Sequence, residues 1–135
     1  MNRDLRNQLI EHEGLRLKPY RCTAGKVTIG VGRNLDDVGI SREEALLLLA
    51  HDVKECEADL RRLLPSWLAY SLRRRHALID MRLNLGPGRL RGFRRMLAAI
   101  RAGAWEAASD EAMDSKWARQ VGRRAETIAR MLREG

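Results

Sequence analysis

The chain has 135 residues, of which 44% are hydrophobic and 33% charged, and this apolar content excludes an intrinsically disordered chain. Two cysteines, three prolines and 11 glycines exclude a disulfide scaffold and a collagen. The net charge is +8, and all of it lies in residues 66–135, which carry 15 basic and 7 acidic residues against 11 of each in residues 1–65. An anionic partner is therefore expected: nucleic acid, an anionic membrane or a cell-wall polymer.

The first forty residues predict a short helix followed by a small sheet. Apolar spacing favours a helix over 3–13, with Gly14 as its C-cap. Alternating or β-branched segments follow at 15–18 and 26–32, with turn-forming residues at 23–26 between them. This pattern predicts a β-hairpin or meander.

A long helix is expected next. Ser41 and Glu44 fit a capping box at its start, and Pro65 ends it. A helix over 42–64 would be roughly 34 Å long, which is enough to bridge two lobes. Cys56 lies on its apolar stripe and is expected to be a buried small hydrophobe.

The rest of the chain reads as helical. Helices are expected near 67–84, 90–102, 104–113 and 122–134, with breaks at 86–88, Gly103, around Lys116 and at Gly122. The predicted fold class is α+β, mainly α, with a small β-hairpin lobe joined by a long helix to a helical lobe. The predicted parts are a β-containing lobe at 14–40, an interlobe helix at 41–65, and a helical lobe at 66–135 that also takes in the helix 3–13.

Targeting signals and cofactor motifs are the next features. There is no run of 18 apolar residues and no apolar segment after Met1, so we expect neither a membrane span nor a signal peptide. Both cysteines are expected to be free thiols. The three histidines lack ligand spacing, and no zinc-binding, phosphate-loop or dinucleotide motif occurs. We expect no metal and no cofactor.

One constellation stands out as candidate chemistry. Glu13 ends the first predicted helix, Cys22 lies at the hairpin turn, and Thr28 lies on the second strand. A carboxyl group, a second ionisable group and a hydroxyl that binds water can together line a hydrolytic cleft. From these residue types alone, a helix-end carboxylate, a buried thiol and a strand hydroxyl without catalytic roles remain the alternative.

The spacing of these three residues carries a family resemblance. Eight residues separate Glu13 from Cys22 and five separate Cys22 from Thr28, flanked by Glu-Gly-Leu-Arg-Leu-Lys-x-Tyr and Thr-Ile-Gly-x-Gly. This arrangement resembles phage-type lysozymes, the endolysins of glycoside hydrolase family 24, and the likeness continues along most of the chain. It implies one lysozyme-like domain over 1–135. It also implies a muramidase that hydrolyses the β-1,4 bond between N-acetylmuramic acid and N-acetylglucosamine in peptidoglycan and so lyses bacteria.

The resemblance also implies roles for the catalytic residues. Glu13 is the general acid, and Thr28 helps to hold the attacking water. Cys22 stands where the best-known members have Asp, and three roles are open for it: the base that activates water, a direct nucleophile, or a group that shapes the water site. Water activation with inversion of the anomeric centre is favoured, because the family type inverts.

Further positions carry over from the resemblance as supporting residues. Substrate-binding positions are Asn34, Leu83 and Glu111, whereas Met96 replaces a polar residue at another such position. Arg124 is expected to pair with Glu13. Arg33 is expected to pair with Asp52 and so tie the hairpin lobe to the long helix.

The implied partners are peptidoglycan and the anionic cell envelope, with a holin for release from the host cytoplasm to the periplasm and cell wall. We expect a monomer and no nucleic acid. The alternatives are a catalytically silent peptidoglycan-binding relative, a lytic transglycosylase, or a basic helical module that binds nucleic acid through arginines such as those at 73–75.

Overall fold

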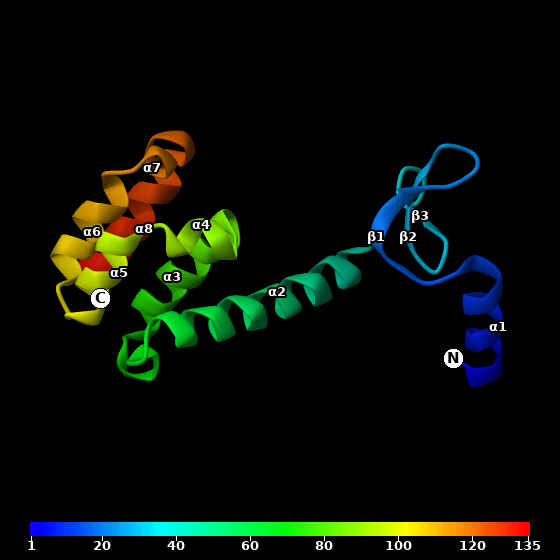
Figure 1. Ribbon diagram of the computed structural model, residues 1–135, viewed down its shortest axis with the longest axis horizontal. Helices are drawn as coiled ribbons and strands as arrows, with labels where there is room; N and C mark the ends of the chain where they lie inside the picture. Colours follow the sequence, from blue (N-terminus) through cyan, green and yellow to red (C-terminus); the bar gives the residue numbers. More distant parts are fainter. The chain divides into compact units, whose positions relative to one another are not determined.

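The computed structural model describes all 135 residues and confirms a mainly helical α+β fold with one small sheet (Figure 1). The elements in chain order are α1 (Arg3–Glu13), β1 (Arg16–Arg21), β2 (Val27–Gly30), β3 (Arg33–Asn34), α2 (Arg42–Leu63), a 3₁₀ helix (Trp67–Ala69), α3 (Leu72–Leu85), α4 (Pro87–Arg91), α5 (Arg94–Arg101), α6 (Trp105–Met113), α7 (Lys116–Val121) and α8 (Arg123–Glu134). None of these helices combines the length and the apolar character that crossing a membrane requires.

Internal contacts divide the chain into two units, Met1–Leu47 and Leu48–Gly135. The boundary falls within α2, so this helix contributes its first turns to one unit and the rest to the other. The first unit holds the sheet and α1, and the second holds the remaining helices. The prediction that α1 completes the helical lobe concerns packing between the units and stays a prediction.

The sheet of the first unit is an antiparallel meander with strand order β1-β2-β3. Thr28 lies at its centre, paired with Tyr20 on one side and Asn34 on the other. The β1–β2 register shifts between Arg16 and Tyr20. Pro19 lies in this interval and has no N–H to donate to a ladder, which fits a local irregularity. The predicted meander is thus confirmed.

Local capping explains where the first helices begin and end. The Asn2 side chain accepts hydrogen bonds from the backbone N–H groups of Asp4 and Leu5, which satisfies two of the free donors of α1. At the start of α2, the Glu44 N–H donates to the Ser41 hydroxyl (3.1 Å) and the Ser41 N–H donates to the Glu44 carboxylate (2.9 Å). The predicted capping box is therefore present.

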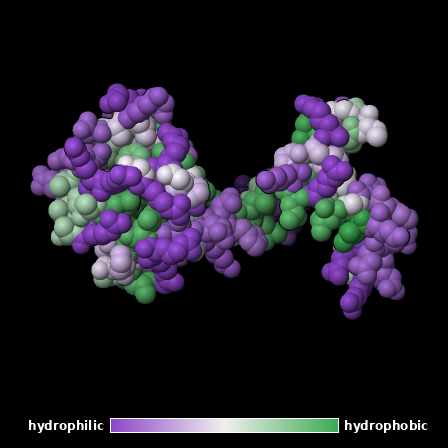
Figure 2. Space-filling model, in the orientation of Figure 1, coloured by the Kyte–Doolittle hydropathy of each residue, from purple (hydrophilic) through white to green (hydrophobic).

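The second unit is built around one apolar core. The core residues come from every helix of the unit: Leu60, Leu64, Trp67, Ala77, Leu78, Met81, Leu85, Leu90, Met96, Leu97, Ile100, Ala108, Ala112, Trp117, Ala118, Ala125, Ile128 and Leu132. Figure 2 shows hydrophilic residues over much of the visible face of this unit. The contrast between face and core is what amphipathic helices produce when they bury one stripe each.

The helix boundaries of the second unit differ from the prediction in four places. The helix expected near 90–102 is divided between α4, which ends at Arg91, and α5, which begins at Arg94. The segment expected as one helix over 67–84 is broken before α3, because the Ser71 hydroxyl caps a new helix by accepting from the Arg74 N–H at 3.2 Å. The break expected around 86–88 instead starts the short helix α4, with Pro87 in its first turn, where a missing N–H costs nothing. A further helix, α7, begins after Ser115, whose hydroxyl accepts from the Ala118 N–H at 3.0 Å.

A buried carboxylate joins three helices of the second unit. Asp59 on α2 is 2% exposed and accepts from Arg82 of α3 (2.8 Å) and Arg91 of α4 (2.7 Å), with Arg62 at 3.5 Å. Cys56 lies beside this cluster, 1% exposed, and its sulfur is 3.8 Å from an Arg82 nitrogen. Cys56 is thus buried as predicted, at the edge of an ionic cluster.

Candidate active site

Glu13 is the last residue of α1, and a glycine fixes where the helix stops. Gly14 has φ +79° and its N–H donates to the Ile10 carbonyl at 2.7 Å, a left-handed helix end that favours glycine. The Glu13 side chain lies against Gly32, in the turn between β2 and β3. It also lines a hollow of about 330 Å³ between α1 and that turn. The end of the helix and the end of the sheet therefore meet at this carboxylate.

Cys22 lies directly after β1, in the turn that closes the hairpin. Its N–H donates to the Lys26 carbonyl (2.9 Å) and its carbonyl accepts from the Gly25 N–H (2.8 Å). The thiol is half-buried. Hydrogen bonds to the sulfur from the backbone of Lys26 and Ala24 lower the pKa of the Cys22 thiol. The turn therefore favours the thiolate, which is the form that acts as a base or nucleophile.

Thr28 shares a face of the sheet with Cys22. Thr28 pairs with Tyr20, and Cys22 follows Tyr20 by two residues, which places both side chains on one face. The Thr28 side chain is 3% exposed, and its hydroxyl donates to the Lys26 carbonyl at 2.9 Å. The hydroxyl also hydrogen-bonds to the Cys22 sulfur, which helps to lower the pKa of that thiol. The lone pairs of the hydroxyl can accept a hydrogen bond from a water.

Asn34 lies beside Thr28 on β3, but its amide is used within the chain. Its nitrogen donates to the Asp37 carboxylate (2.9 Å), and its oxygen accepts from the Asp37 N–H (3.0 Å). Lys26 also reaches Asp37, at 3.2 Å. The amide thus shapes the loop after β3, and its predicted contact with substrate stays a prediction.

Arg33 is paired within the first unit, with Glu44 at the start of α2. Its two terminal nitrogens bind both carboxylate oxygens of Glu44, at 3.0 and 2.8 Å, and one of them also donates to the Gly39 carbonyl. The hydrogen bonds from Arg33 lower the pKa of the Glu44 carboxyl to about 2. Glu44 thus fills the guanidinium fork in the bidentate geometry that arginine prefers. The expected pair with Asp52, which lies in the second unit, stays a prediction.

Arg124 lies in the second unit and is paired there. On α8, its guanidinium contacts the Asp80 carboxylate of α3 at 2.8 and 2.7 Å. Both side chains remain roughly 40% exposed. Its predicted pairing with Glu13 stays a prediction.

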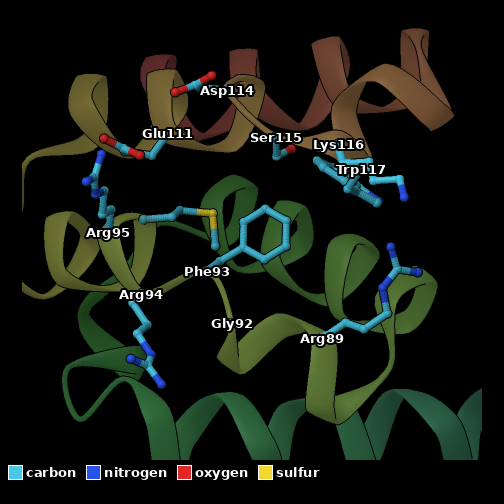
Figure 3. A pocket seen from close by; sticks show the side chains of 11 residues that line it. Arg89, Gly92, Phe93, Arg94, Arg95, Glu111, Asp114, Ser115, Lys116 and Trp117 are labelled. Carbon is cyan, nitrogen blue, oxygen red and sulfur yellow. The ribbon is translucent and has the colours of Figure 1, made fainter.

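The second unit carries a pocket of about 520 Å³ with an aromatic wall and basic flanks. Phe93 and Trp117 meet edge to face, with ring centroids 6.1 Å apart. Figure 3 shows Phe93 in the middle, with Arg95 and Glu111 on one side and Arg89 and Lys116 on the other. The residues that line it are Arg89, Gly92, Phe93, Arg94, Arg95, Met96, Glu111, Asp114, Ser115, Lys116 and Trp117.

The positions in the second unit that the resemblance relates to substrate binding differ in whether they line this pocket. Glu111 lines the pocket and is half-buried. Met96 lines it as well and is 1% exposed, so it contributes to the core. Leu83 lies on α3, is 39% exposed and does not line the pocket. The Phe93–Trp117 wall was not predicted from the sequence, although aromatic residues are only 4% of this chain and each could have been examined as a candidate ligand contact.

The sequence matches a known protein family over most of its length. The family described as phage lysozyme matches residues 10–133, a range that includes Glu13, Cys22 and Thr28. The chain belongs to the phage lysozyme family. The resemblance seen in the Glu13–Cys22–Thr28 spacing is thereby confirmed, together with the lysozyme-like fold.

Two relatives show how this lysozyme-family chain compares with longer proteins. It is 30% identical over 162 aligned residues to the pre-baseplate central spike protein Gp5 of Enterobacteria phage T4, covering 99% of this chain and 28% of that protein. It is 43% identical over 53 residues to an endolysin of Acyrthosiphon pisum secondary endosymbiont phage 1, covering 36% of each chain. The aligned part is thus 28% of the first relative and 36% of the second, well under two thirds of either protein.

Proposed function

We propose that the protein is a muramidase that cuts the β-1,4 bond between N-acetylmuramic acid and N-acetylglucosamine in peptidoglycan. The observation that carries this proposal is the family match across Glu13, Cys22 and Thr28. Two structural features support it. Glu13 is set at a helix end against the sheet, and Cys22 and Thr28 share one face of that sheet.

In the proposed reaction Glu13 is the general acid. Its carboxyl gives a proton to the glycosidic oxygen as the bond from that oxygen to the anomeric carbon breaks. The leaving sugar then departs as a neutral alcohol. The positive charge that develops at the anomeric carbon is neutralised when the water oxygen bonds to that carbon. The acid ends the cycle as a carboxylate and takes a proton back from solvent.

Cys22 is the base in this proposal. Its thiolate accepts a proton from water while the water oxygen bonds to the anomeric carbon on the face opposite the leaving group, which inverts the configuration. The thiol then releases this proton to solvent, which regenerates the base. Thr28 holds that water through a lone pair of its hydroxyl. The hydrogen bonds that lower the pKa of the Cys22 thiol support the role, because they raise the thiolate fraction near neutral pH.

The substrate fits the charge and the pocket of the second unit. Peptidoglycan carries carboxylates, and the basic residues Arg89, Arg95 and Lys116 line a pocket that also offers an aromatic wall. None of these three cations is in an ion pair within the protein. They are therefore available to an anionic polymer.

The direct test is the release of reducing ends from purified peptidoglycan, under a thiol reductant. We expect release by the wild-type protein, with products that end in N-acetylmuramic acid carrying a free reducing group. Products with anhydro ends would identify a transglycosylase instead. Binding to peptidoglycan without release would identify a silent relative, and retention on DNA at physiological salt without cleavage would favour a nucleic-acid module.

The role of Cys22 predicts opposite results for two substitutions. Cys22→Asp restores an ionised base and is expected to keep activity, whereas Cys22→Ala removes the base and is expected to lose about 10²-fold or more in kcat. The acidic limb of the pH–rate profile should move to lower pH in Cys22→Asp, because a carboxyl ionises below a thiol. Thr23→Ala, in the same turn, is the control. Unchanged activity in Cys22→Ala would remove Cys22 from the mechanism.

A further inference from the structure

Gly32 lies directly against the Glu13 side chain in the first unit. A Cβ built on Gly32 would overlap the Glu13 Oε2 atom and lie 3.0 and 3.2 Å from Cδ and Cγ. These distances are shorter than ordinary carbon–carbon contact. The carboxylate therefore occupies the space that a side chain at position 32 would need.

The backbone at Gly32 has little freedom to move away. The next residue, Arg33, pairs with Ile29 in the sheet. Its guanidinium is fixed to Glu44 and to the Gly39 carbonyl. Gly32 itself has φ +69°, a left-handed conformation that closes the turn. A group added at Gly32 would thus displace the flexible end of Glu13 before it displaced the turn.

We infer that Gly32 is a positioning residue for the general acid, an inference that rests on the proposed function. The Glu13 carboxyl packs against the Cα of Gly32, in space that a side chain would otherwise fill. The lack of a side chain at position 32 therefore determines where the carboxyl lies when it donates its proton. Displacement of a reacting group by about 1 Å costs on the order of 10²-fold in rate.

Gly30, the last residue of β2, provides a matched control next to the same turn. It has the same φ, +69°, and a Cβ built there meets nothing within 4 Å. Gly30→Ala and Gly32→Ala therefore carry the same backbone strain, and only Gly32→Ala meets the carboxylate. We expect both variants to lower Tm by a similar amount, and only Gly32→Ala to lower kcat by about 10²-fold with little change in KM.

A double substitution separates positioning from general damage. Aspartate at position 13 is shorter by one methylene and withdraws the carboxyl from position 32. In the Glu13→Asp background, Gly32→Ala should therefore cost much less than it costs in the wild type. Equal fold losses in the two backgrounds would mean that the two sites act independently and would overturn the inference.

An NMR measurement, which does not depend on catalysis, can test the positioning role of Gly32 separately from the proposed muramidase activity. With ¹³C-labelled glutamate, we expect the Glu13 Cδ resonance to shift in Gly32→Ala and to stay in place in Gly30→Ala. A protein that shows this difference but releases no reducing ends would contradict the proposed function and support the contact. An unshifted resonance in Gly32→Ala, with the same kcat as Gly30→Ala, would overturn the positioning role.

Discussion

Glu13→Gln is expected to reduce the release of reducing ends from peptidoglycan by about 10²–10⁴-fold, the range that a lost general acid costs. Glutamine keeps the size and shape of the side chain, so the contact with Gly32 is retained. It carries no proton that it can give to the leaving oxygen. The expected loss is in kcat, with binding to peptidoglycan unchanged, measured by reducing-end release and by pull-down on the same wall preparation.

Glu11→Gln is the control for this result. Glu11 lies on the same helix, is exposed and has no ion-pair partner in the structure, so its substitution should change stability by less than about 0.5 kcal/mol. It should also leave activity at the wild-type level. Equal activity in the wild type and Glu13→Gln would exclude Glu13 as the acid, whatever the family match implies.

Local signals predicted the first unit well. The capping box of Ser41 and Glu44 and the C-cap Gly14 are written in a few adjacent residues. The structure bears out both. The pairing of Arg33 with Glu44 could not be predicted from local signals, because the sequence assigns the Glu44 carboxylate to the capping box of α2. One carboxylate serves both purposes, which the sequence pattern does not show.

In the second unit, the short helices and the buried carboxylate depend on contacts between distant residues, and local sequence patterns did not predict them. Helices α4 and α7 are only five and six residues long, too short to show apolar periodicity. Asp59 lies on the long helix, where a carboxylate is usually solvent-exposed. Its burial depends on arginines 23 and 32 positions away. Glu13 and Gly32 are also far apart in the sequence, so their contact could not be predicted from local signals.

The ionic cluster at Asp59 leads to the largest expected loss of stability. Asp59→Asn keeps the shape of the side chain but removes its charge, leaving Arg82, which is 12% exposed, without its counter-ion. Removing one partner of a buried ion pair costs about 3–5 kcal/mol. We therefore expect the Tm to fall by about 10–20 °C, measured by thermal unfolding. Glu134→Gln breaks the exposed pair with Arg73 and should cost less than about 1 kcal/mol.

The same cluster predicts how this loss depends on pH. Burial by itself raises the pKa of the Asp59 carboxyl, but the hydrogen bond from Arg82 and the nearby arginine charges outweigh burial and lower the pKa. A lowered pKa means that Asp59 contributes its full stability above the unfolded value of about 3.9 and loses it as the pH falls through the folded value. The gap in unfolding free energy between wild type and Asp59→Asn should therefore be constant from about pH 7 to 5 and shrink below about pH 4.

Glu44, with a pKa of about 2, titrates in both proteins and cancels from this difference. Denaturant unfolding at a series of pH values measures the gap directly. A gap that persists undiminished to the lowest pH at which the protein folds would mean that the shape of the side chain, and not its charge, holds α2, α3 and α4 together. A gap that closes assigns the stabilisation to the charge, because protonated aspartate and asparagine are then nearly equivalent in size and both are neutral.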